Sequence, residues 1–267
     1  MDATKLANDL IELHQHPRLV APFSARYPGL TAEQGYAAAR KLHAHRLAQG
    51  WQPVGRKIGF TNRTIWPRYG VFEPMWGYVY DRTLIRAQDG RAKVPLAGLV
   101  QPRIEPEICF RMRARPPATR DPQALLDCIE WIAHSVEIVQ CHHPDWKVTI
   151  ADCTADNGLH GRLILGTPVP VERISGLAPA LPFLKVDLLK DRERKDQGIG
   201  SNVLGSPLLA LSHLIDILER DHDAAPLEPG EIVSTGTLTD AHPVQAGETW
   251  RTDLHGFAVK GLTLNFE

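Results

Sequence analysis

Two glutamates, Glu105 and Glu107, are separated by one residue in the segment Ile-Glu-Pro-Glu-Ile-Cys-Phe. The apolar residues Ile104, Ile108 and Phe110 alternate with them, which is typical of a β-strand. Side chains two residues apart on a strand point to the same face, so both carboxylates should project side by side. Such a pair repels unless a proton or cation intervenes, and Mg²⁺ or Mn²⁺ prefers oxygen ligands of this kind. The alternative is an exposed strand face with two hydrated glutamates.

A third carboxylate favours the metal hypothesis. Glu137 lies in the strand-forming run Ser-Val-Glu-Ile-Val-Gln, where a buried charge requires a partner. A divalent cation held by these three glutamates keeps open positions for the C1 carboxylate and C2 oxygen of a 2-oxo acid. Acting as a Lewis acid, it would stabilise an enolate. An enolate serves water addition, decarboxylation and carbon–carbon cleavage alike, so the metal site by itself does not choose among them.

Composition limits the class of protein. The chain has 267 residues, of which 43% are hydrophobic and 23% are charged, as in a soluble globular protein with a sizeable core. Its 30 basic and 31 acidic residues form no long run of one sign, which disfavours nucleic acid or an anionic membrane as a partner. We found no signal-peptide core and no apolar stretch near the ~20 residues that span a bilayer. The four cysteines are widely spaced, as expected of reduced thiols in a cytoplasmic protein.

The chain divides near residue 50 into a helical N-terminal cap, 1–50, and a β-rich metal-binding catalytic domain, 51–267. In the cap, Leu6, Leu10 and Leu13 recur at helical spacing, and Thr31 with Gln34 forms a capping box that opens a second helix. Residues 16–30 hold three prolines and are predicted to form a loop.

Beyond residue 50, short apolar runs alternate with glycine and proline turns. Two Asp-Pro or Ser-Pro pairs predict further helices, one from Asp121 that carries Leu125 through Ile132, and one from Ser206 that runs to Leu218. Strands are predicted at 231–234, 249–254 and 257–266, and a charged loop at 191–200.

Several segments, taken in order, resemble a known family. They are 54–61, which contains Lys57, the Glu105 to Glu137 region, 155–158, 200–207 and 233–238. Their order and spacing are similar to those of the hydratase and decarboxylase branch of the fumarylacetoacetate hydrolase superfamily, from about Lys57 to the C-terminus. Typical members are 2-oxopent-4-enoate hydratases, 2-oxohept-4-ene-1,7-dioate hydratases and 4-oxalocrotonate decarboxylases.

The resemblance implies an α+β fold, with an N-terminal helical cap followed by a mixed β-roll core. It implies metal-dependent hydration of a 2-hydroxy-2,4-dienoate to a 4-hydroxy-2-oxo acid through a metal-bound enolate, in aromatic or related ring catabolism. The alternatives are a 2-oxo acid decarboxylase, a carbon–carbon bond hydrolase, and a non-catalytic partner subunit. The family also implies a homo-oligomer, with a sister decarboxylase or hydratase as a further partner.

Site residues follow from the resemblance. Lys57 stands where family members carry a lysine that handles protons. The family's two aspartate positions downstream of it are Phe72 and Met75 here, so either Glu73 between them is the substitute acid or the proton chemistry differs. We expect substrate contacts from Asp156, Asn157, His160 and Thr237, although the chain has Gly-Leu where the family has Ala-Ser after Asn157. On residue types alone, His142 and His143 offer a rival metal site, which their opposite directions on an extended segment disfavour.

Overall fold

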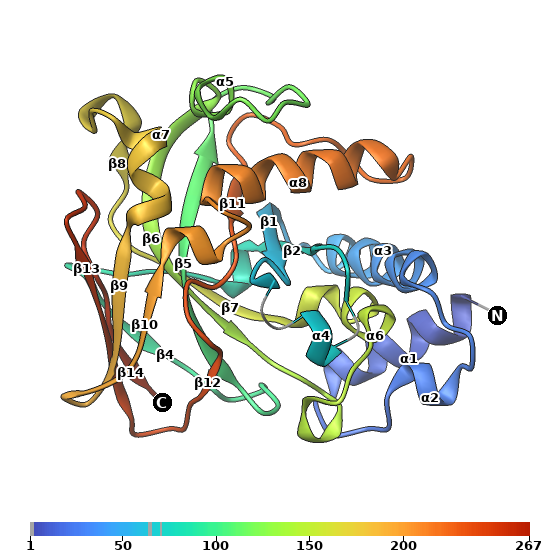
Figure 1. Ribbon diagram of the computed structural model, residues 1–267. Coiled ribbons are helices and arrows are strands. Elements are labelled where there is room, and N and C mark those ends of the chain that lie inside the picture. Colours follow the sequence, from blue (N-terminus) through green and yellow to red (C-terminus); the bar gives the residue numbers. More distant parts are fainter. Residues whose placement is uncertain (1–2, 64–65, 70) are drawn as a thin grey trace.

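The computed structural model describes residues 3–63, 66–69 and 71–267 and places them in a helical layer and two mixed sheets (Figure 1). The helices near the N-terminus gather at one end of the molecule, and the two curled sheets lie at the other. This arrangement confirms the predicted α+β fold with a helical cap and a mixed β-roll. The division at residue 50 stays a prediction, because α6 from much later in the chain packs against the same helical layer.

The larger sheet carries the predicted metal ligands. Its main path in the described chain is β2 (Met75–Tyr80), β1 (Pro53–Gly59), β11 (Ile232–Ser234), β5 (Arg103–Met112), β6 (Ile129–Val139), β7 (His160–Leu165) and β3 (Leu84–Arg86). Two short strands extend it, β8 (Val169–Pro170) beside β6 and β12 (His242–Pro243) beside β5. Strand β5 is central and antiparallel to both neighbours, β11 and β6.

The smaller sheet covers one side of this framework. Its order is β10 (Glu193–Ile199), β9 (Lys185–Lys190), β13 (Thr249–His255), β14 (Thr263–Phe266) and β4 (Arg91–Val94). Trp250, Leu264 and Phe266 of this sheet pack with Ile104 of β5 and Ile138 of β6 in one buried cluster. The sheet therefore supports the strands that hold the glutamates.

The helices of the described chain lie in the N-terminal layer and beside the two sheets. They are α1 (Ala3–Gln15), α2 (Phe23–Arg26), α3 (Ala32–Ala48), α4 (Trp66–Tyr69), α5 (Pro122–Leu126), α6 (Ile150–Ala155), α7 (Leu177–Ala180) and α8 (Pro207–Arg220). The predicted capping box of α3 is confirmed, since Thr31 and Gln34 each accept a hydrogen bond from the other's backbone N–H. Gly35 lets α3 approach α6 closely, because a Cβ there would lie 2.2 Å from Thr154 Oγ1.

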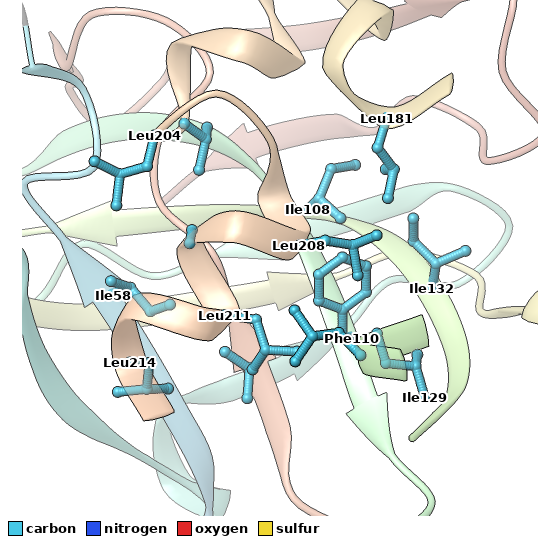
Figure 2. Packing of buried hydrophobic residues seen from close by; sticks show 14 of the residues in the cluster. Ile58, Ile108, Phe110, Ile129, Ile132, Leu181, Leu204, Leu208, Leu211 and Leu214 are labelled. Carbon is cyan, nitrogen blue, oxygen red and sulfur yellow. The ribbon is translucent and has the colours of Figure 1, made fainter. Parts of the chain in front are cut away.

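Helix α8 fills the space beside the larger sheet. Figure 2 shows Leu208, Leu211 and Leu214 facing Ile58 of β1 and Phe110 of β5. By length and composition the helical stretch Gly200–Arg220 would suffice to cross a membrane, but 67% of its most apolar window is buried inside the protein. That burial is what a core helix requires.

Four predicted elements differ from the structure. The helix predicted to include Ile129 and Ile132 ends at Leu126, and both isoleucines belong to β6. Strand β6 is buried on both faces, so its sequence lacks the alternation that marks a strand. Residues 193–199, predicted to be a loop, form the edge strand β10, whose charged side chains face solvent. The strand predicted over 257–266 begins only at Thr263, and the predicted loop 16–30 includes the short helix α2.

Candidate metal centre and cavity

Three carboxylates meet where β5 pairs with β6. Glu105 and Glu107 project from one face of β5, and Glu137 lies directly opposite Glu105 in the strand register. One oxygen of each residue lies within 4.8 Å of those of the other two. The structure therefore brings together the three glutamates that the sequence predicted as metal ligands.

Glu107 is held by β11 and by the turn that follows it. Its side chain is fully buried. Ser234 Oγ donates a hydrogen bond to Oε2 over 2.5 Å, and the Gly236 backbone N–H donates to the same oxygen over 3.0 Å. Gly236 has φ of +101°, and a Cβ there would lie 1.9 Å from Thr61 Oγ1, so the turn requires glycine. The other oxygen, Oε1, is buried without a hydrogen-bond partner, as expected of an atom that would ligate a cation.

Glu137 is oriented by a histidine. The ring nitrogen Nδ1 of His160 donates to Glu137 Oε1 over 2.8 Å, and Nε2 lies 2.8 Å from Thr83 Oγ1. Burial lowers the pKa of His160 despite the neighbouring carboxylate, so the ring stays neutral at pH 7. The remaining oxygen, Glu137 Oε2, accepts no hydrogen bond and lies 3.3 Å from Lys57 Nζ. A histidine that fixes a ligating carboxylate is a common outer partner of metal sites.

The electrostatics of the cluster require a further positive charge. Burial raises the pKa of Glu105 to about 7, Glu137 adds to the rise, and Lys57 opposes it. Burial, together with Glu137 and Glu105, raises the pKa of Glu107 well above its usual range. Burial by itself would lower the pKa of Lys57, but Glu137, Glu105 and Glu107 outweigh it and raise that pKa. One lysine thus faces three carboxylates, and hard oxygen donors with buried unpartnered atoms fit a divalent cation such as Mg²⁺ or Mn²⁺.

These shifts predict opposite pH dependences for the metal-free and metal-loaded protein. The pKa of Glu105 is 4.5 in the unfolded chain and about 7 in the folded protein. At pH values between the two, Glu105 is more often protonated in the folded protein than in the unfolded chain. The stability of the metal-free protein should therefore fall as pH rises through this window. Metal binding needs deprotonated carboxylates, so metal affinity should rise over the same window, with proton release at pH 6.

Calorimetry at pH 6 in buffers of different ionisation enthalpy measures the released protons directly. Metal binding without proton release at pH 6 would contradict the raised pKa values. The same titration at pH 8.5 is the control, because Glu105 is then already ionised.

Glu105 lines a cavity of about 80 Å³, and Glu107 and Glu137 lie buried behind it. Its charged and polar wall includes Lys57, Glu105, Arg103 and Thr237. Apolar side chains line the rest of the wall, namely Ile58, Phe60, Met75, Val139, Trp146, Val148, Leu159 and Ala241. A small acid with an apolar middle fits such a surface, with its anionic end at the metal centre.

Lys57 is positioned by an unusual turn. Its Nζ donates to the Gly158 carbonyl oxygen over 2.8 Å. Asn157, Gly158 and Leu159 follow one another with φ of +49°, +66° and +60°, a left-handed run that costs free energy at the two non-glycine residues. The run aims the Gly158 carbonyl at Lys57 and thereby holds Nζ beside Glu137.

Two predicted substrate contacts are structural supports of this turn. Asn157 accepts a hydrogen bond from the Tyr78 backbone N–H over 2.9 Å and donates one to the Tyr78 carbonyl oxygen over 3.0 Å. It does not line the cavity. Asp156 is buried 2.7 Å from His142 Nδ1 and 2.8 Å from His14 Nε2. Burial by itself would raise the pKa of Asp156, but His142 and His14 hold it well below its usual range. Neither side chain lines the cavity, and their contact with substrate stays a prediction.

Of the remaining predicted site residues, one lines the cavity and two do not. Thr237 lines the cavity, as expected for a substrate contact, whereas His160 lies behind Glu137 rather than in the cavity wall. Glu73, predicted to replace the family aspartate, is 58% exposed and lies 3.3 Å from Arg220, outside the cavity. The turn at Pro74 sends its side chain toward α8, while Met75 faces the cavity.

The rival histidine site is not assembled. His142 is committed to Asp156, and His143 packs edge-on against Phe23. In the part of the chain that the structure describes, the glutamate trio is the group identified as able to hold a metal ion. Asp145 and Lys147, which follow the two histidines, are exposed and paired with each other.

Ser234 and Thr83, which orient the ligands, had no role predicted from the sequence, and the hydrogen bond from the Gly236 N–H to Glu107 was not predicted either. Ser234 and Gly236 belong to the segment 233–238 that carries the family resemblance, so a signal was present. Nothing local marks Thr83. Arg103 also reaches the cavity, and the alternation that pairs Glu105 with Glu107 places it on the same face.

Known proteins are similar to this chain over most of its length. No protein-family model matches it. It is 30% identical over 251 residues to a 2-hydroxyhexa-2,4-dienoate hydratase of Comamonas testosteroni, covering 92% of this chain and 91% of that protein. It is 28% identical over 226 residues to a 4-oxalocrotonate decarboxylase of a Pseudomonas species, covering 84% of each.

Solved structures share the fold. A 4-oxalocrotonate decarboxylase from Pseudomonas putida G7, complexed with magnesium and adipate, superposes with a TM-score of 0.89 at 24% identity, over 99% of this chain and 97% of that one. A fumarylpyruvate hydrolase from Pseudomonas aeruginosa, in complex with Mn²⁺ and pyruvate, gives a TM-score of 0.60 at 12% identity, over 79% and 88%.

Proposed function

Because this chain belongs to the hydratase and decarboxylase branch of the fumarylacetoacetate hydrolase superfamily, we propose that it hydrates a 2-hydroxy-2,4-dienoate to a 4-hydroxy-2-oxo acid with Mg²⁺ or Mn²⁺. The relatives confirm the resemblance and the enzyme class predicted from the sequence, a hydro-lyase similar to 2-keto-4-pentenoate hydratases. The observation that carries the proposal is the trio Glu105, Glu107 and Glu137 beside Lys57, with Glu105 and Lys57 in the wall of a largely apolar cavity.

A divalent cation at the trio supplies Lewis-acid polarisation of the substrate's C1 carboxylate and C2 oxygen. Other residues of the chain orient the ligands and line the cavity. Ser234 and Gly236 fix Glu107, and His160 fixes Glu137, so the ligand oxygens are arranged before substrate arrives. The apolar wall would limit the access of water to the diene.

Lys57 is the group we assign to proton transfer. Ketonisation takes a proton from the 2-hydroxyl and delivers one to C5. Water then adds at C4, and C3 gains the last proton. Neutralising the three carboxylates would remove the charge that raises the Lys57 pKa, and burial would then lower that pKa. A lysine whose pKa is lowered gives up its proton more readily, as a general acid–base group requires.

Decarboxylation is the second candidate, because one relative and one structural neighbour are 4-oxalocrotonate decarboxylases and the same ligands would serve both reactions. Carbon–carbon hydrolysis uses the same polarised oxygen, and a non-catalytic subunit would show no turnover. The homo-oligomer, the sister subunit and the cytoplasmic location remain predictions from the sequence.

Product analysis tests the proposal. The purified chain with Mg²⁺ or Mn²⁺ should convert 2-hydroxypenta-2,4-dienoate or its six-carbon homologue to a 4-hydroxy-2-oxo acid, followed by loss of diene absorbance and by NMR. Release of CO₂ from a 2-oxo diacid without hydration would identify a decarboxylase. Absence of metal-dependent turnover of every such acid would favour the non-catalytic subunit.

A further inference from the structure

His14, in the last turn of α1, lies between two charged side chains from later parts of the chain. Its ring nitrogen Nε2 is 2.8 Å from Asp156 Oδ1, and Nδ1 is 3.2 Å from a guanidinium nitrogen of Arg46 on α3. A guanidinium only donates, so Nδ1 accepts and the ring hydrogen is on Nε2, beside the carboxylate. Burial and Arg46 lower the pKa of His14 to about 4, so this ring is neutral at pH 7.

The Asp156 carboxylate is held from both sides. Nδ1 of His142, in the segment after β6, lies 2.7 Å from Oδ2, while His14 lies beside Oδ1. The two imidazole rings meet edge to face, with their centroids 5.3 Å apart. Two segments far apart in the sequence therefore fix one buried carboxylate.

Asp156 also begins the turn that holds Lys57. It caps the C-terminal end of α6, and the left-handed residues 157–159 follow it directly. Gly158, two positions after Asp156, accepts the hydrogen bond from Lys57 Nζ over 2.8 Å. Asn157 binds the same turn to the backbone of β2. The carbonyl that fixes the lysine nitrogen thus has two anchors, one on β2 and one at the Asp156 carboxylate.

We propose that His14 is a positioning residue for Lys57 and acts through Asp156 and the turn 157–159. The inference rests on the proposed function, in which Lys57 transfers protons. Through these contacts α1 determines where the Gly158 carbonyl holds Nζ. His14 does not line the cavity, so its loss should displace Nζ and leave the cavity wall and the metal ligands in place. A displacement of about 1 Å can lower a rate by about 100-fold.

The alternative role of His14 is purely structural, as a partner that stabilises a buried carboxylate. The two roles differ in what they affect. A structural role lowers the melting temperature and leaves kcat per folded molecule unchanged. A positioning role lowers kcat, while KM and the affinity for Mg²⁺ stay the same.

The test replaces His14 with two amides of different length. The side-chain nitrogen of glutamine reaches about as far as Nε2 of histidine, whereas that of asparagine reaches only as far as Nδ1. With 2-hydroxypenta-2,4-dienoate and Mg²⁺, kcat should fall about 10- to 100-fold in His14→Asn and less than about threefold in His14→Gln. KM and Mg²⁺ affinity should stay within about twofold in both. His16→Asn, which changes an exposed histidine just after α1, is the matched control.

Turnover is expressed per Mg²⁺-binding molecule, counted by calorimetry, so unfolded protein does not contribute. If His14→Asn does not fold, Asp156→Asn, which keeps the shape of the carboxylate, takes its place. A second comparison uses the Lys57→Met protein, in which His14→Asn should lower the remaining kcat by less than about twofold. There the lysine that His14 positions is absent.

An equal loss of kcat with and without Lys57 would show that His14 acts independently of the lysine and would overturn the inference. Unchanged kcat in His14→Asn, or a loss of Mg²⁺ affinity in its folded form, would also overturn it and leave the proposed function standing. If the unaltered protein turns over no 2-hydroxy-2,4-dienoate with Mg²⁺, the proposed function itself fails, and the inference fails with it.

Discussion

Replacing Glu107 with glutamine is expected to abolish tight binding of Mg²⁺ or Mn²⁺ while the protein stays folded. Glu107 is fully buried, and its Oε1 has no hydrogen-bond partner. A glutamine oxygen would still accept from Ser234 Oγ and the Gly236 N–H, so the local structure persists. Loss of outer-shell partners typically weakens metal binding 10- to 100-fold, so loss of a ligand should weaken it by at least about 100-fold.

The same substitution should stabilise the metal-free protein at pH 8. There the ionised form of Glu107 is disfavoured by burial and by Glu137 and Glu105, which is why its pKa is raised. Glutamine removes that charge. Calorimetric titration with Mn²⁺ and thermal unfolding with and without metal measure both effects. Glu130→Gln is the matched control, because Glu130 lies on β6 but is 46% exposed. Unchanged metal affinity in Glu107→Gln would remove Glu107 from the ligand set.

Replacing Lys57 with methionine is expected to lower kcat by about 10²- to 10⁴-fold, the usual contribution of a general acid or base. Metal affinity should be retained or increased, because the lysine competes with the cation for Glu137. The metal-free protein should become less stable, since a buried carboxylate loses its ion pair. Turnover with saturating Mg²⁺ separates the catalytic loss from this loss of stability.

Glu73→Gln provides the comparison. Glu73 is exposed and paired with Arg220, and in this arrangement its substitution should change kcat less than threefold. A 100-fold loss in that variant would show that Glu73 reaches the cavity during turnover, as the sequence analysis proposed. A loss below threefold in Lys57→Met would remove Lys57 from proton transfer.

The metal centre was predictable because it follows from a local rule. The alternation of Glu105 and Glu107 with Ile104 and Ile108 specifies one polar and one apolar face of a strand, and β5 has both. Glu137 was predictable because a carboxylate among β-branched residues needs a partner. Helices α3 and α8 were predictable for similar reasons, since their capping residues lie within three positions of their first turns.

The site residues other than the metal ligands are positioned by contacts between segments that lie far apart in the sequence. His160 was assigned to substrate, but its ring is taken up by Glu137, 23 residues away, and by Thr83, 77 residues away. Asp156 was assigned to substrate because its neighbours resemble a family motif, while its actual partners come from α1 and from the segment after β6. A motif identifies a segment that matters, yet the side chains that reach the cavity are decided by packing between elements.

The pairing of Asp156 with His14 has a consequence for attempts to shorten this protein. The helical layer supplies partners to two buried carboxylates of the later chain, His14 to Asp156 and Ser24 to Asp152, the latter through two hydrogen bonds of 2.8 Å. Leaving a buried charge with no partner costs about 3–5 kcal/mol, against a total stability of about 5–15 kcal/mol for an ordinary domain, so losing one partner of two should cost part of that. A fragment beginning at Trp51 would lose His14 and Ser24, and would leave Asp156 with His142 and Asp152 with Thr149. Shortened or fused versions of the protein should therefore retain the first fifty residues.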